Sequence, residues 1–539
     1  MRIAIAQINP LLGDIKNNEI KIVEYIKRAV SKKAELIVFP ESSLLGYHPF
    51  DLLERSELVD ELGKALKRIQ KKIPKNVGII LGTITRNKNK QGRPYFNSAV
   101  LLERNKSQFF NKQLLPTGDV FDEARFIESG KLEDNYFRFK GRPFFLTICE
   151  DIWAWPDSRG VSSYTKNPLK DIKLRKVDLV INLSASPWFI GKEKLRQAVA
   201  TQTAKKFKAP LLYTNLVGAQ DEIIFDGESF IVTPEGKRIL QCNKFVEDLN
   251  VFDLNTQQVW SPVRQDEKIE QLRKALVLGI RDFCHKIGIQ NVHLGLSGGI
   301  DSALVACLAV DALGPGAVKT ISLPGPHSAA MSEELALQLA KNLGVKHQSV
   351  SINPAYDLLA DTFKNQFGAS DFGISYENLQ SRLRGLLLMG LANIENSLLL
   401  TTGNKSEYAT GYCTLYGDMC GGLAPLGDLT KGQVYQLAKH YNSQHELIPQ
   451  KIIDRPPTAE LRPNQKDQDS LPEYELLDKS VINIVEKGKR AKGKVDQWLI
   501  RQLVKTEFKR WQAPPILKVS SHSFGRGRRW PLAHKAFLA

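Results

Sequence analysis

The stretch "VHLGLSGGIDSALVACLAV" at residues 292–310 constrains the fold of this chain more than any other feature, because it passes from a short apolar strand through a glycine turn into an apolar helix. Such a turn leaves the N–H groups of the first helical turn unpaired, and its glycines let an anion approach them closely. A second strand and helix follow at "VKTISLP" and "SEELALQLAKNLG". This rhythm predicts an α/β domain with a doubly wound parallel sheet of Rossmann type, with an anion site at residues 297–302.

The N-terminal half has a different rhythm, with many short apolar runs separated by polar turns. These runs read as strands at "RIAIAQI", "ELIVFP", "VGIILGT", "SAVLLE", "FFLTIC", "DLVINLS", "PLLYTN" and "SFIVT". Between the first two, Ile22, Ile26, Ala29 and Val30 recur at helical spacing. Strands interleaved with amphipathic helices predict a second, layered α/β domain.

The length of 539 residues also requires more than one domain, because single cores stop growing at roughly 250–300 residues. The strand rhythm stops near "VFDLNTQQVWSPVRQDEKIE" and a polar stretch leads into a helix-like segment. We therefore predict one domain at residues 1–255, a linker at 256–274, and a second domain with a C-terminal tail at 275–539.

Composition indicates the compartment in which the protein works. The six cysteines are scattered and form no CxxC pair, which favours free thiols in a reducing compartment and argues against zinc. No run approaches the ~18 apolar residues of a membrane span, and no apolar stretch of signal-peptide length begins the chain. We expect a cytoplasmic enzyme that binds no membrane.

The formal net charge of +17 leaves two interpretations open. It is compatible with a nucleic-acid footprint or with a solvated basic surface that attracts small anionic substrates. The basic residues are spread along the chain, which favours the second interpretation, so we expect small-molecule partners and no nucleic acid.

The glycine turn lacks the lysine of a P-loop and carries Asp301 instead, and a carboxylate beside phosphates makes sense mainly if Mg²⁺ lies between them. The motif resembles the SGGxDS loop of the N-type ATP pyrophosphatases, which bind the pyrophosphate end of ATP and adenylate their substrates. The resemblance implies ATP and Mg²⁺ as ligands. The implied ATP-binding residues are Ser297, Gly298, Gly299, Asp301, Ser302 and Thr402.

Further segments of the second half resemble the NAD synthetase family. They are "ENLQSRLRG", "TTGNKSEYATGYCTLYGDMCGG", "LTKGQ", "DRPPTAEL", "QDSLPEYELLD" and "HSFGRGRRWPL". The resemblance implies that Asp301 and Glu407 share the metal ion. It implies contacts to deamido-NAD or to the phosphates for Asn378, Arg382, Glu407, Asp418 and Lys431. One stretch departs from the family pattern, "LPGPHSAAMSEELA" around residues 324–334, so the contacts of that segment stay open.

In the first half, Glu41, Lys112 and Cys149 stand at or near the ends of expected strands and resemble the Glu-Lys-Cys triad of the nitrilase family. That resemblance implies an α-β-β-α sandwich. It implies that Cys149 attacks a glutamine amide, that Glu41 moves the proton, and that Lys112 stabilises the developing charge. The implied glutamine-binding residues are Tyr47, Phe121, Glu123, Ser186 and Lys192, the last where many relatives carry arginine.

The loop "AWPDSRGVSSYTKNP" after Cys149 is compatible with a lid over this site or with a tolerated surface insertion.

Together the resemblances imply glutamine-dependent amidation of deamido-NAD to NAD. Ammonia released at a thioester on Cys149 would pass through an internal tunnel to an adenylated intermediate, with release of AMP and pyrophosphate. They also imply a homo-oligomer, at least a dimer. We further expect the glutaminase to respond to the substrates of the second site, because uncoupled hydrolysis would waste glutamine.

Two alternatives stay open: an amide ligase of the same architecture acting on another carboxylate, and a basic RNA-binding protein that modifies tRNA.

Overall fold

The computed structural model describes residues 1–89, 91–157, 159–256, 266–368, 373–534 and 536–537. The chain divides into two compact units, Met1–Asp266 and Glu267–Ala539. Residues 257–265 of the predicted linker lie outside the described residues, and the helix α5, Lys268–Lys286, begins within the range predicted as linker. Each unit has its own sheets and core, so they are described in turn.

Two six-stranded sheets form the N-terminal unit. The first has the order β16-β1-β2-β3-β4-β5, in which β1, β2 and β3 are parallel and the outer pairs antiparallel. Its strands are β1 (Arg2–Gln7), β2 (Leu36–Val38), β3 (Gly78–Arg86), β4 (Tyr95–Glu103), β5 (Lys106–Asn111) and β16 (Asp248–Asp253).

The second sheet has the order β15-β14-β11-β10-β9-β8, with β9, β10 and β11 parallel. Its strands are β8 (Tyr136–Phe139), β9 (Arg142–Ile148), β10 (Leu179–Ser184), β11 (Leu211–Asn215), β14 (Phe230–Val232) and β15 (Arg238–Gln241). Two short hairpins add β6 (Thr117–Gly118) with β7 (Phe121–Asp122), and β12 (Val217–Gln220) with β13 (Ile223–Asp226).

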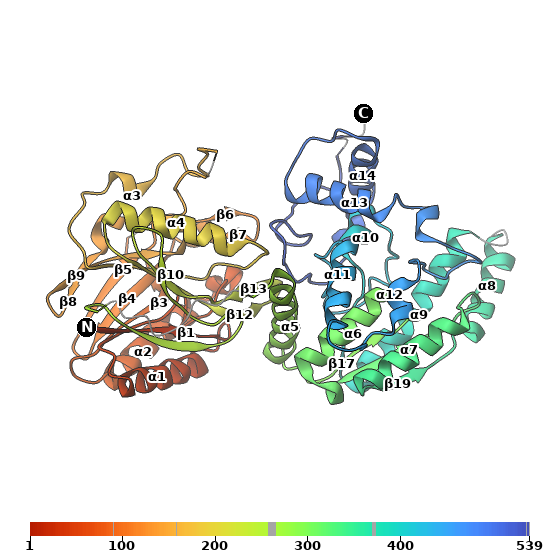
Figure 1. Ribbon diagram of the computed structural model, residues 1–539, viewed down its shortest axis with the longest axis horizontal. Helices are drawn as coiled ribbons and strands as arrows, with labels where there is room; N and C mark the ends of the chain where they lie inside the picture. The colour runs from red at the N-terminus through yellow and green to blue at the C-terminus, as the bar shows by residue number, and fades with distance from the viewer. Residues whose placement is uncertain (90, 158, 257–265, 369–372, 535, 538–539) are drawn as a thin grey trace. The chain divides into compact units, whose positions relative to one another are not determined.

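The alternation of side chains along β1 shows how the layers form. Ile3 and Ile5 pack between the two sheets, whereas Ala4 and Ala6 pack against helices on the outer face. Those helices are α1 (Ile15–Ser31) and α2 (Ser56–Lys72), which lie together under the first sheet in Figure 1. The helix α4 (Lys192–Phe207) covers the outer face of the second sheet, and α3 (Pro168–Asp171) is a single turn. This is the predicted α-β-β-α sandwich, which the structure confirms.

The C-terminal unit holds the predicted parallel sheet, with the order β19-β18-β17-β20. Its strands are β17 (Val292–Gly295), β18 (Val318–Ser322), β19 (Lys346–Ser349) and β20 (Leu398–Leu399). The chain runs from β17 outward to β19 and then returns to the other side of β17. The order therefore reverses between β17 and β20, where doubly wound sheets bind ligands beyond the carboxyl ends of their strands.

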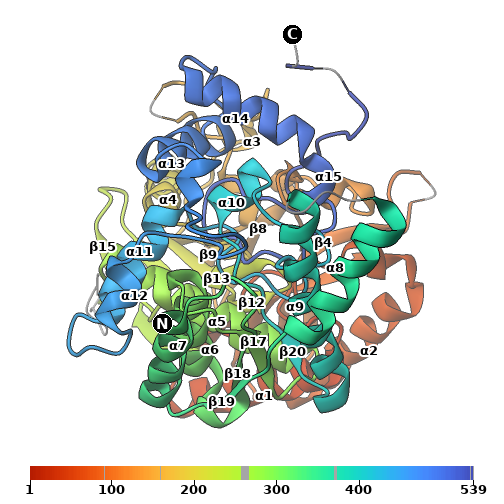
Figure 2. The ribbon, with the colours of Figure 1, turned by 90° about the vertical axis from the view of Figure 1, so that its right-hand side faces the viewer.

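Helices cover both faces of this sheet, as Figure 2 shows. The helix α6 (Ile300–Leu313) is buried over most of its surface, as its uniformly apolar sequence requires, and packs with α5, α7 and α11. On the other face, α9 packs against β17 and β20 and against α8. The remaining helices are α7 (Ala330–Leu343), α8 (Asn353–Phe367), α9 (Ile374–Glu395), α10 (Lys405–Thr410), α11 (Lys431–Tyr441), α12 (Gln450–Asp454), α13 (Tyr474–Val481), α14 (Lys494–Lys505) and α15 (Glu507–Arg510).

All six cysteines lie within the described residues and are free thiols. No helix in the described part of the chain is long and apolar enough to cross a membrane.

Two candidate active sites

Cys149 directly follows β9 and begins a short 3-10 turn, Cys149–Ile152. Its backbone is left-handed, with φ of 44°, a conformation that a non-glycine residue adopts only when its surroundings impose it. The buried Asp151 carboxylate supplies that constraint: its Oδ2 accepts from the N–H of Ile148 at 2.9 Å, and its Oδ1 accepts from the N–H groups of Gln113 and Leu114, each at 2.9 Å. Asp151 therefore ties the segment that follows Lys112 to the turn that carries Cys149.

Lys112 lies between two carboxylates in a fully enclosed cluster. Its Nζ is 2.8 Å from Glu41 Oε1 and 2.8 Å from Glu123 Oε1, and none of the three side chains is more than 2% exposed. The structure thus brings Glu41, Lys112 and Glu123 together from three separate loops. A buried lysine with two hydrogen-bonded carboxylates is a permanent cation.

Further donors fix the orientation of the two carboxylates. Asn97 donates from Nδ2 to Glu41 Oε1 at 2.8 Å, and the backbone N–H of Ala185, just after β10, donates to Glu41 Oε2 at 2.8 Å. The Tyr47 hydroxyl donates to Glu123 Oε1 at 2.7 Å. Asn97 and Asp151 were not among the predicted site residues, since a polar residue in or just after a strand gives no sign of its distant partner.

The electrostatics separate the two carboxylates into different roles. Burial raises the pKa of Glu41, although Lys112 opposes the rise. For Glu123 burial acts in the same direction, but Lys112, His48 and the hydrogen bond from Tyr47 together outweigh it, so the pKa is lowered. Burial and the Glu41 carboxylate raise the pKa of the Cys149 thiol well above its usual value, and Lys112 opposes that rise. A thiol that keeps its proton needs a neighbouring base, and two carboxylates whose pKa values are pushed apart can divide the acid and base work.

The predicted glutamine-binding residues lie around this cluster. The Tyr47 ring is 6.5 Å from the Phe121 ring, and both belong to an apolar group that includes Ala185 and Phe225. Ser186 is buried next to Ala185.

The ammonium group of Lys192 lies 4.0 Å from the centre of the Trp153 ring, close to the Cys149 turn. An ammonium group held on an aromatic ring next to the Cys149 turn can form an ion pair with the carboxylate of a substrate.

Two hydrogen bonds tie the loop after Cys149 to neighbouring residues. The Tyr164 hydroxyl donates to Glu150 Oε1 at 2.8 Å, and Trp155 Nε1 donates to Thr203 Oγ1 of α4 at 2.8 Å. Ser158 of this loop lies outside the described residues. Both interpretations of the loop, as a lid and as a surface insertion, stay predictions.

In the second unit, the loop between β17 and α6 is held in shape by its own serines. The Ser302 hydroxyl lies 3.1 Å from that of Ser297 and donates to the Gly299 carbonyl at 3.0 Å, while the Gly299 N–H donates to Ser297 Oγ at 3.3 Å. Gly298 has φ of 74°, and a Cβ there would lie 2.3 Å from the Ser332 carbonyl oxygen, so only glycine fits. The start of α6 is thus presented as a preformed anion site.

Asp301 and Glu407 share a lysine across the reversal point of the sheet. Lys431 Nζ lies 2.6 Å from Asp301 Oδ2 and 3.5 Å from Glu407 Oε1, and Asn404 Nδ2 donates to Asp301 Oδ1 at 2.9 Å. Asn404 and Glu407 also cap the start of α10 reciprocally. Burial raises the pKa of Glu407 to about 8, and the Asp301 carboxylate adds to the rise while Lys431 opposes it.

A cavity of about 440 Å³ opens over this loop and the ends of the strands. The predicted residues that line it are Ser297, Gly299, Asp301, Ser302, Asn378, Thr402, Glu407, Asp418 and Lys431. Gly298 does not line the cavity and faces the Ser332 carbonyl oxygen instead. Arg382 is exposed on α9 and donates to the Leu415 carbonyl, so it is not among the lining residues.

Arg384, two residues further along α9, lines the cavity where Arg382 does not. Its Nε donates to the Leu323 carbonyl at 2.9 Å, and burial lowers its pKa to about 10. The sequence "QSRLRG" offers two arginines, and only the rotation of the helix decides which one faces the cavity.

The segment at residues 324–334 that departs from the family pattern also reaches this cavity. Glu460 accepts from the Ser332 hydroxyl at 2.6 Å and from the Ala329 N–H at 3.2 Å, and Arg455 donates to Ser332 Oγ at 2.8 Å. Segment 324–334 is thereby joined to the "DRPPTAEL" loop at the edge of the cavity.

Among the residues that the structure describes, no group of three or more His, Cys, Asp or Glu side chains could hold a metal ion by itself. Asp301 and Glu407 nevertheless suit Mg²⁺, which is usually held by one or two carboxylates together with substrate phosphates. The ammonium group of Lys431 already marks a place where both carboxylates face one cation. The donor set therefore fits Mg²⁺ brought in with a nucleotide.

Comparisons with known proteins agree with this division. A carbon-nitrogen hydrolase family model matches residues 2–261, and an NAD synthase model matches residues 272–513. A protein of Synechocystis sp. named glutamine-dependent NAD(+) synthetase is 44% identical over 550 residues, covering 98% of each chain. One of the same name from Acinetobacter baylyi is 38% identical, covering 99% of this chain and 98% of the relative.

Two solved structures extend the agreement to three dimensions. The glutamine-dependent NAD+ synthetase of Acinetobacter baumannii, in complex with ADP, has a TM-score of 0.78 at 35% identity and covers 98% of each chain. A glutamine-dependent NAD(+) synthetase from Cytophaga hutchinsonii has a TM-score of 0.84 at 20% identity, covering 100% of this chain and 98% of that one, which shows the fold alone.

Proposed function

The chain belongs to the family of glutamine-dependent NAD(+) synthetases, and from that premise we propose how its two sites divide the reaction. The enzyme is a carbon–nitrogen ligase that uses glutamine and ATP to amidate deamido-NAD to NAD. The N-terminal unit releases ammonia from glutamine, and the C-terminal unit activates the acceptor carboxylate. The observation that carries the proposal is the enclosed Glu41-Lys112-Glu123 cluster beside Cys149, in a unit separate from the nucleotide cavity.

In the first unit, Cys149 attacks the amide carbon of glutamine and forms a glutamyl thioester. Glu41 takes the thiol proton and delivers it to the departing ammonia, a role that suits the carboxylate with the raised pKa. Lys112 stays protonated between its carboxylates and stabilises the negative charge on the tetrahedral intermediate. Glu123 stays ionised, holds Lys112 in place, and is itself oriented by Tyr47.

The glutamine itself is held by the predicted pocket residues. Tyr47 and Phe121 contact the aliphatic part of the substrate, Ser186 donates a hydrogen bond to it, and Lys192 pairs with its α-carboxylate. The position of the Lys192 ammonium group over the Trp153 ring, next to the Cys149 turn, supports this role.

In the second unit, the loop at residues 297–302 and the start of α6 bind the phosphates of ATP. Asp301 and Glu407 would hold a Mg²⁺ ion, which when bound neutralises phosphate charge and helps pyrophosphate to leave. Lys431 then turns from the carboxylates to the phosphates and stabilises the charge that develops as pyrophosphate departs. The deamido-NAD carboxylate attacks the α-phosphate, and ammonia then displaces AMP.

Contacts to the acceptor are assigned to the lining residues Asn378, Glu407 and Asp418. Thr402 is assigned to ATP together with the loop at residues 297–302. Arg382 stays a predicted contact to deamido-NAD, from the exposed face of α9. The other carboxylate ligases of this architecture stay the alternative, and substrate profiling with ATP and different acids separates them.

We also retain the predicted self-association and cytoplasmic location. Five apolar side chains of α9 are exposed: Ile374, Leu386, Leu387, Met389 and Ile394. A second copy of the chain could cover them, which supports at least a dimer. Light scattering of the purified chain tests this, and a monomer at micromolar concentration would contradict it.

The first experiment compares wild type with Cys149→Ala, each given ATP, Mg²⁺ and deamido-NAD, with either glutamine or ammonium as the nitrogen donor. We expect the variant to lose NAD formation from glutamine and to keep it from ammonium. Loss of both would contradict the separation of the two sites. A wild type that forms no NAD from either donor would contradict the acceptor assignment.

A further inference from the structure

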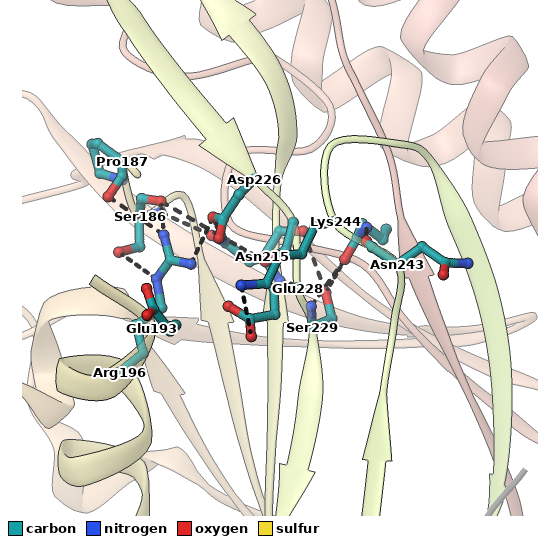
Figure 3. Close-up of polar contacts among 12 residues, drawn as sticks. Ser186, Pro187, Glu193, Arg196, Asn215, Asp226, Glu228, Ser229, Asn243 and Lys244 are labelled. Atoms are coloured by element: carbon teal, nitrogen blue, oxygen red, sulfur yellow. Dashed lines mark hydrogen bonds and ion pairs between the residues drawn. The ribbon is translucent and has the colours of Figure 1, made fainter. Parts of the chain in front are cut away.

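A buried ion pair lies beside the amide-cleaving site and takes no part in the chemistry described above. Arg196, on the inner face of α4, and Asp226, at the end of β13, are both fully buried. Their closest atoms, Nη1 and Oδ1, are 2.6 Å apart. Figure 3 shows the guanidinium group reaching from the helix toward Asp226 and toward the turn at Ser186 and Pro187.

Arg196 uses its remaining N–H groups on that turn. Nη2 donates to the Ser186 carbonyl at 2.7 Å, and Nε lies 3.3 Å from the Ser186 hydroxyl oxygen. Asn215 holds the same residue from the opposite side, because its Oδ1 accepts from the Ser186 N–H at 2.9 Å (Figure 3). The backbone and the hydroxyl of Ser186 are thus fixed by side chains from two other elements.

Stability alone does not account for such a pair. Replacing a buried ion pair by apolar groups of similar volume is often neutral or stabilising, because both charges lose their hydration. What the pair does supply is direction, since a guanidinium group donates in a fixed plane. Here Asp226 fixes the plane of the Arg196 guanidinium group, and the other N–H groups of that plane donate to the turn at Ser186.

The turn touches the catalytic cluster on its other side. The N–H of Ala185, the residue before Ser186, donates to Glu41 Oε2 at 2.8 Å. A shift of this turn would therefore move the Ala185 N–H, which donates to Glu41, the proposed base. In addition, the Ser186 hydroxyl oxygen accepts from Arg196, so its own hydrogen is available for an acceptor other than the guanidinium group.

We propose that Arg196, with Asp226 as its counter-ion, is a positioning residue of the amide-cleaving site. It fixes the turn at residues 185–187 so that Ala185 keeps its N–H on Glu41 and Ser186 offers its hydroxyl proton to an oxygen of the bound glutamine. The inference rests on the proposed function, because it assumes that glutamine is cleaved at Cys149.

The test uses the full chain with Arg196→Lys, which keeps the charge and loses the planar donors. Glutamine-driven NAD formation should fall in kcat/KM by about 10²-fold, as for other small misplacements of catalytic groups, while ammonium-driven formation stays at the wild-type rate. Lys194→Ala, an exposed lysine on the same helix, is the matched control and should leave both rates unchanged. Equal glutamine-driven rates in wild type and Arg196→Lys would overturn the proposal.

A second readout separates positioning from a general structural role. An N–H donor on a carboxylate favours the ionised form, so loosening the turn should raise the pKa of Glu41. The acid limb of kcat/KM for glutamine should then move to higher pH in Arg196→Lys. The other titratable groups that face Glu41 are Tyr47, Lys112, Glu123 and Cys149, and the variant leaves them in place. A lower rate with an unmoved limb would count against the proposal.

A double variant tests the path through Ser186. Ser186→Ala should raise KM for glutamine, and combining it with Arg196→Lys should cost no more than Arg196→Lys alone, because one interaction is removed twice. Additive losses would contradict the coupling.

If Arg196→Lys does not fold, Asp226→Asn, which keeps the shape of the counter-ion, takes its place. Loss of both the glutamine- and the ammonium-driven activity in that variant would mark the pair as structural and overturn the proposal.

Failure of the proposed function would be recognised separately. In that case wild type itself would give no glutamine-driven NAD, and a diazoketone analogue of glutamine would not label Cys149. If wild type passes both checks and the variants match it, only the role of Arg196 fails.

Discussion

The two sites of this protein contain the same arrangement, a lysine between two carboxylates, in opposite surroundings. Lys112 lies 2.8 Å from both Glu41 and Glu123, and all three side chains are at most 2% exposed. Lys431 lies 2.6 Å from Asp301 and 3.5 Å from Glu407, and both carboxylates are 18% exposed at the edge of a large cavity. The enclosed cluster is symmetrical and sealed, whereas the open cluster is uneven and accessible.

This difference bears on which cations can pair with the carboxylates of each cluster. In the enclosed cluster both carboxylates are buried and already paired with Lys112, so Lys112 is a permanent part of the proposed catalytic machinery. In the open cluster a metal ion that arrives with phosphates can compete for Asp301 and Glu407, which frees Lys431 for the substrate. Under the proposed function, the same three charges form a fixed cluster in one unit and a cluster with an exchangeable cation in the other.

Removal of divalent cations should give the largest difference between the two sites. With a chelator present, we expect NAD formation from either donor to stop, because adenylation needs the cation at the open cluster. Labelling of Cys149 by a diazoketone analogue of glutamine, followed by mass spectrometry in the absence of ATP, should continue unchanged. Labelling that also stops would show that the enclosed cluster depends on the metal.

Lys112→Met breaks the enclosed cluster. Glutamine-driven NAD formation should fall by about 10³-fold, because an electrostatic stabiliser and the order of both carboxylates are lost. The free energy of unfolding should fall by about 3–5 kcal/mol, since two buried carboxylates lose their partner.

Steady-state assays and urea unfolding of Lys112→Met measure these effects, with ammonium-driven formation as the internal control. The double variant Lys112→Met with Glu123→Gln should recover part of the stability and none of the activity. Recovery of glutamine-driven activity would contradict the role of Lys112.

Lys431→Met breaks the open cluster and should show the reverse balance. NAD formation from both donors should fall by about 10²–10³-fold, while stability should fall less than in Lys112→Met, because both carboxylates are 18% exposed and can be partly solvated. Parallel assays with glutamine and ammonium, together with the same unfolding experiment, measure this. A stability loss as large as that of Lys112→Met would show that exposure does not separate the clusters.

Glu270→Gln sharpens the comparison with a third cluster outside both sites. Glu270 pairs with Arg273 at 2.9 Å, accepts a hydrogen bond from His440 Nε2 at 2.9 Å, and is 24% exposed. The hydrogen bond from Arg273 outweighs partial burial and lowers the pKa of Glu270 to about 2. Because the pKa is lowered in the folded state, the stabilisation exists above the unfolded pKa near 4.5 and is lost as pH falls toward 2.

We expect Glu270→Gln to lower stability at pH 7 by only about 1 kcal/mol, since partly exposed pairs are screened by solvent. The difference from wild type should shrink steadily below pH 4.5. Thermal unfolding at several pH values measures it, and a difference as large at pH 3 as at pH 7 would contradict the assignment.

Much of the fold followed from local pattern. The alternation in "RIAIAQI" predicts a strand with two apolar faces, and β1 uses one face for the inter-sheet core and the other for α1 and α2. The strands that the pattern missed, such as β8 and β15, lie at sheet edges, where short, mixed sequences carry weaker periodicity.

The sequence by itself determined the α/β character of both units, the parallel sheet of the second, the glycine loop and the types of reactive residue, because these depend on periodicity and on backbone geometry within a few residues. The α-β-β-α arrangement of the first unit was implied by the resemblance to the nitrilase family. Only the tertiary structure decided which charges meet. Lys112 and Glu41 are 71 residues apart, and Lys431 and Asp301 are 130 apart.

Helix rotation likewise decided that Arg384 and not Arg382 lines the cavity, and the packing of separate elements decided where Asp151 and Arg196 lie. The full burial of the carboxylates around Lys112 and the partial exposure of those around Lys431 are properties of the packed chain and of no local segment.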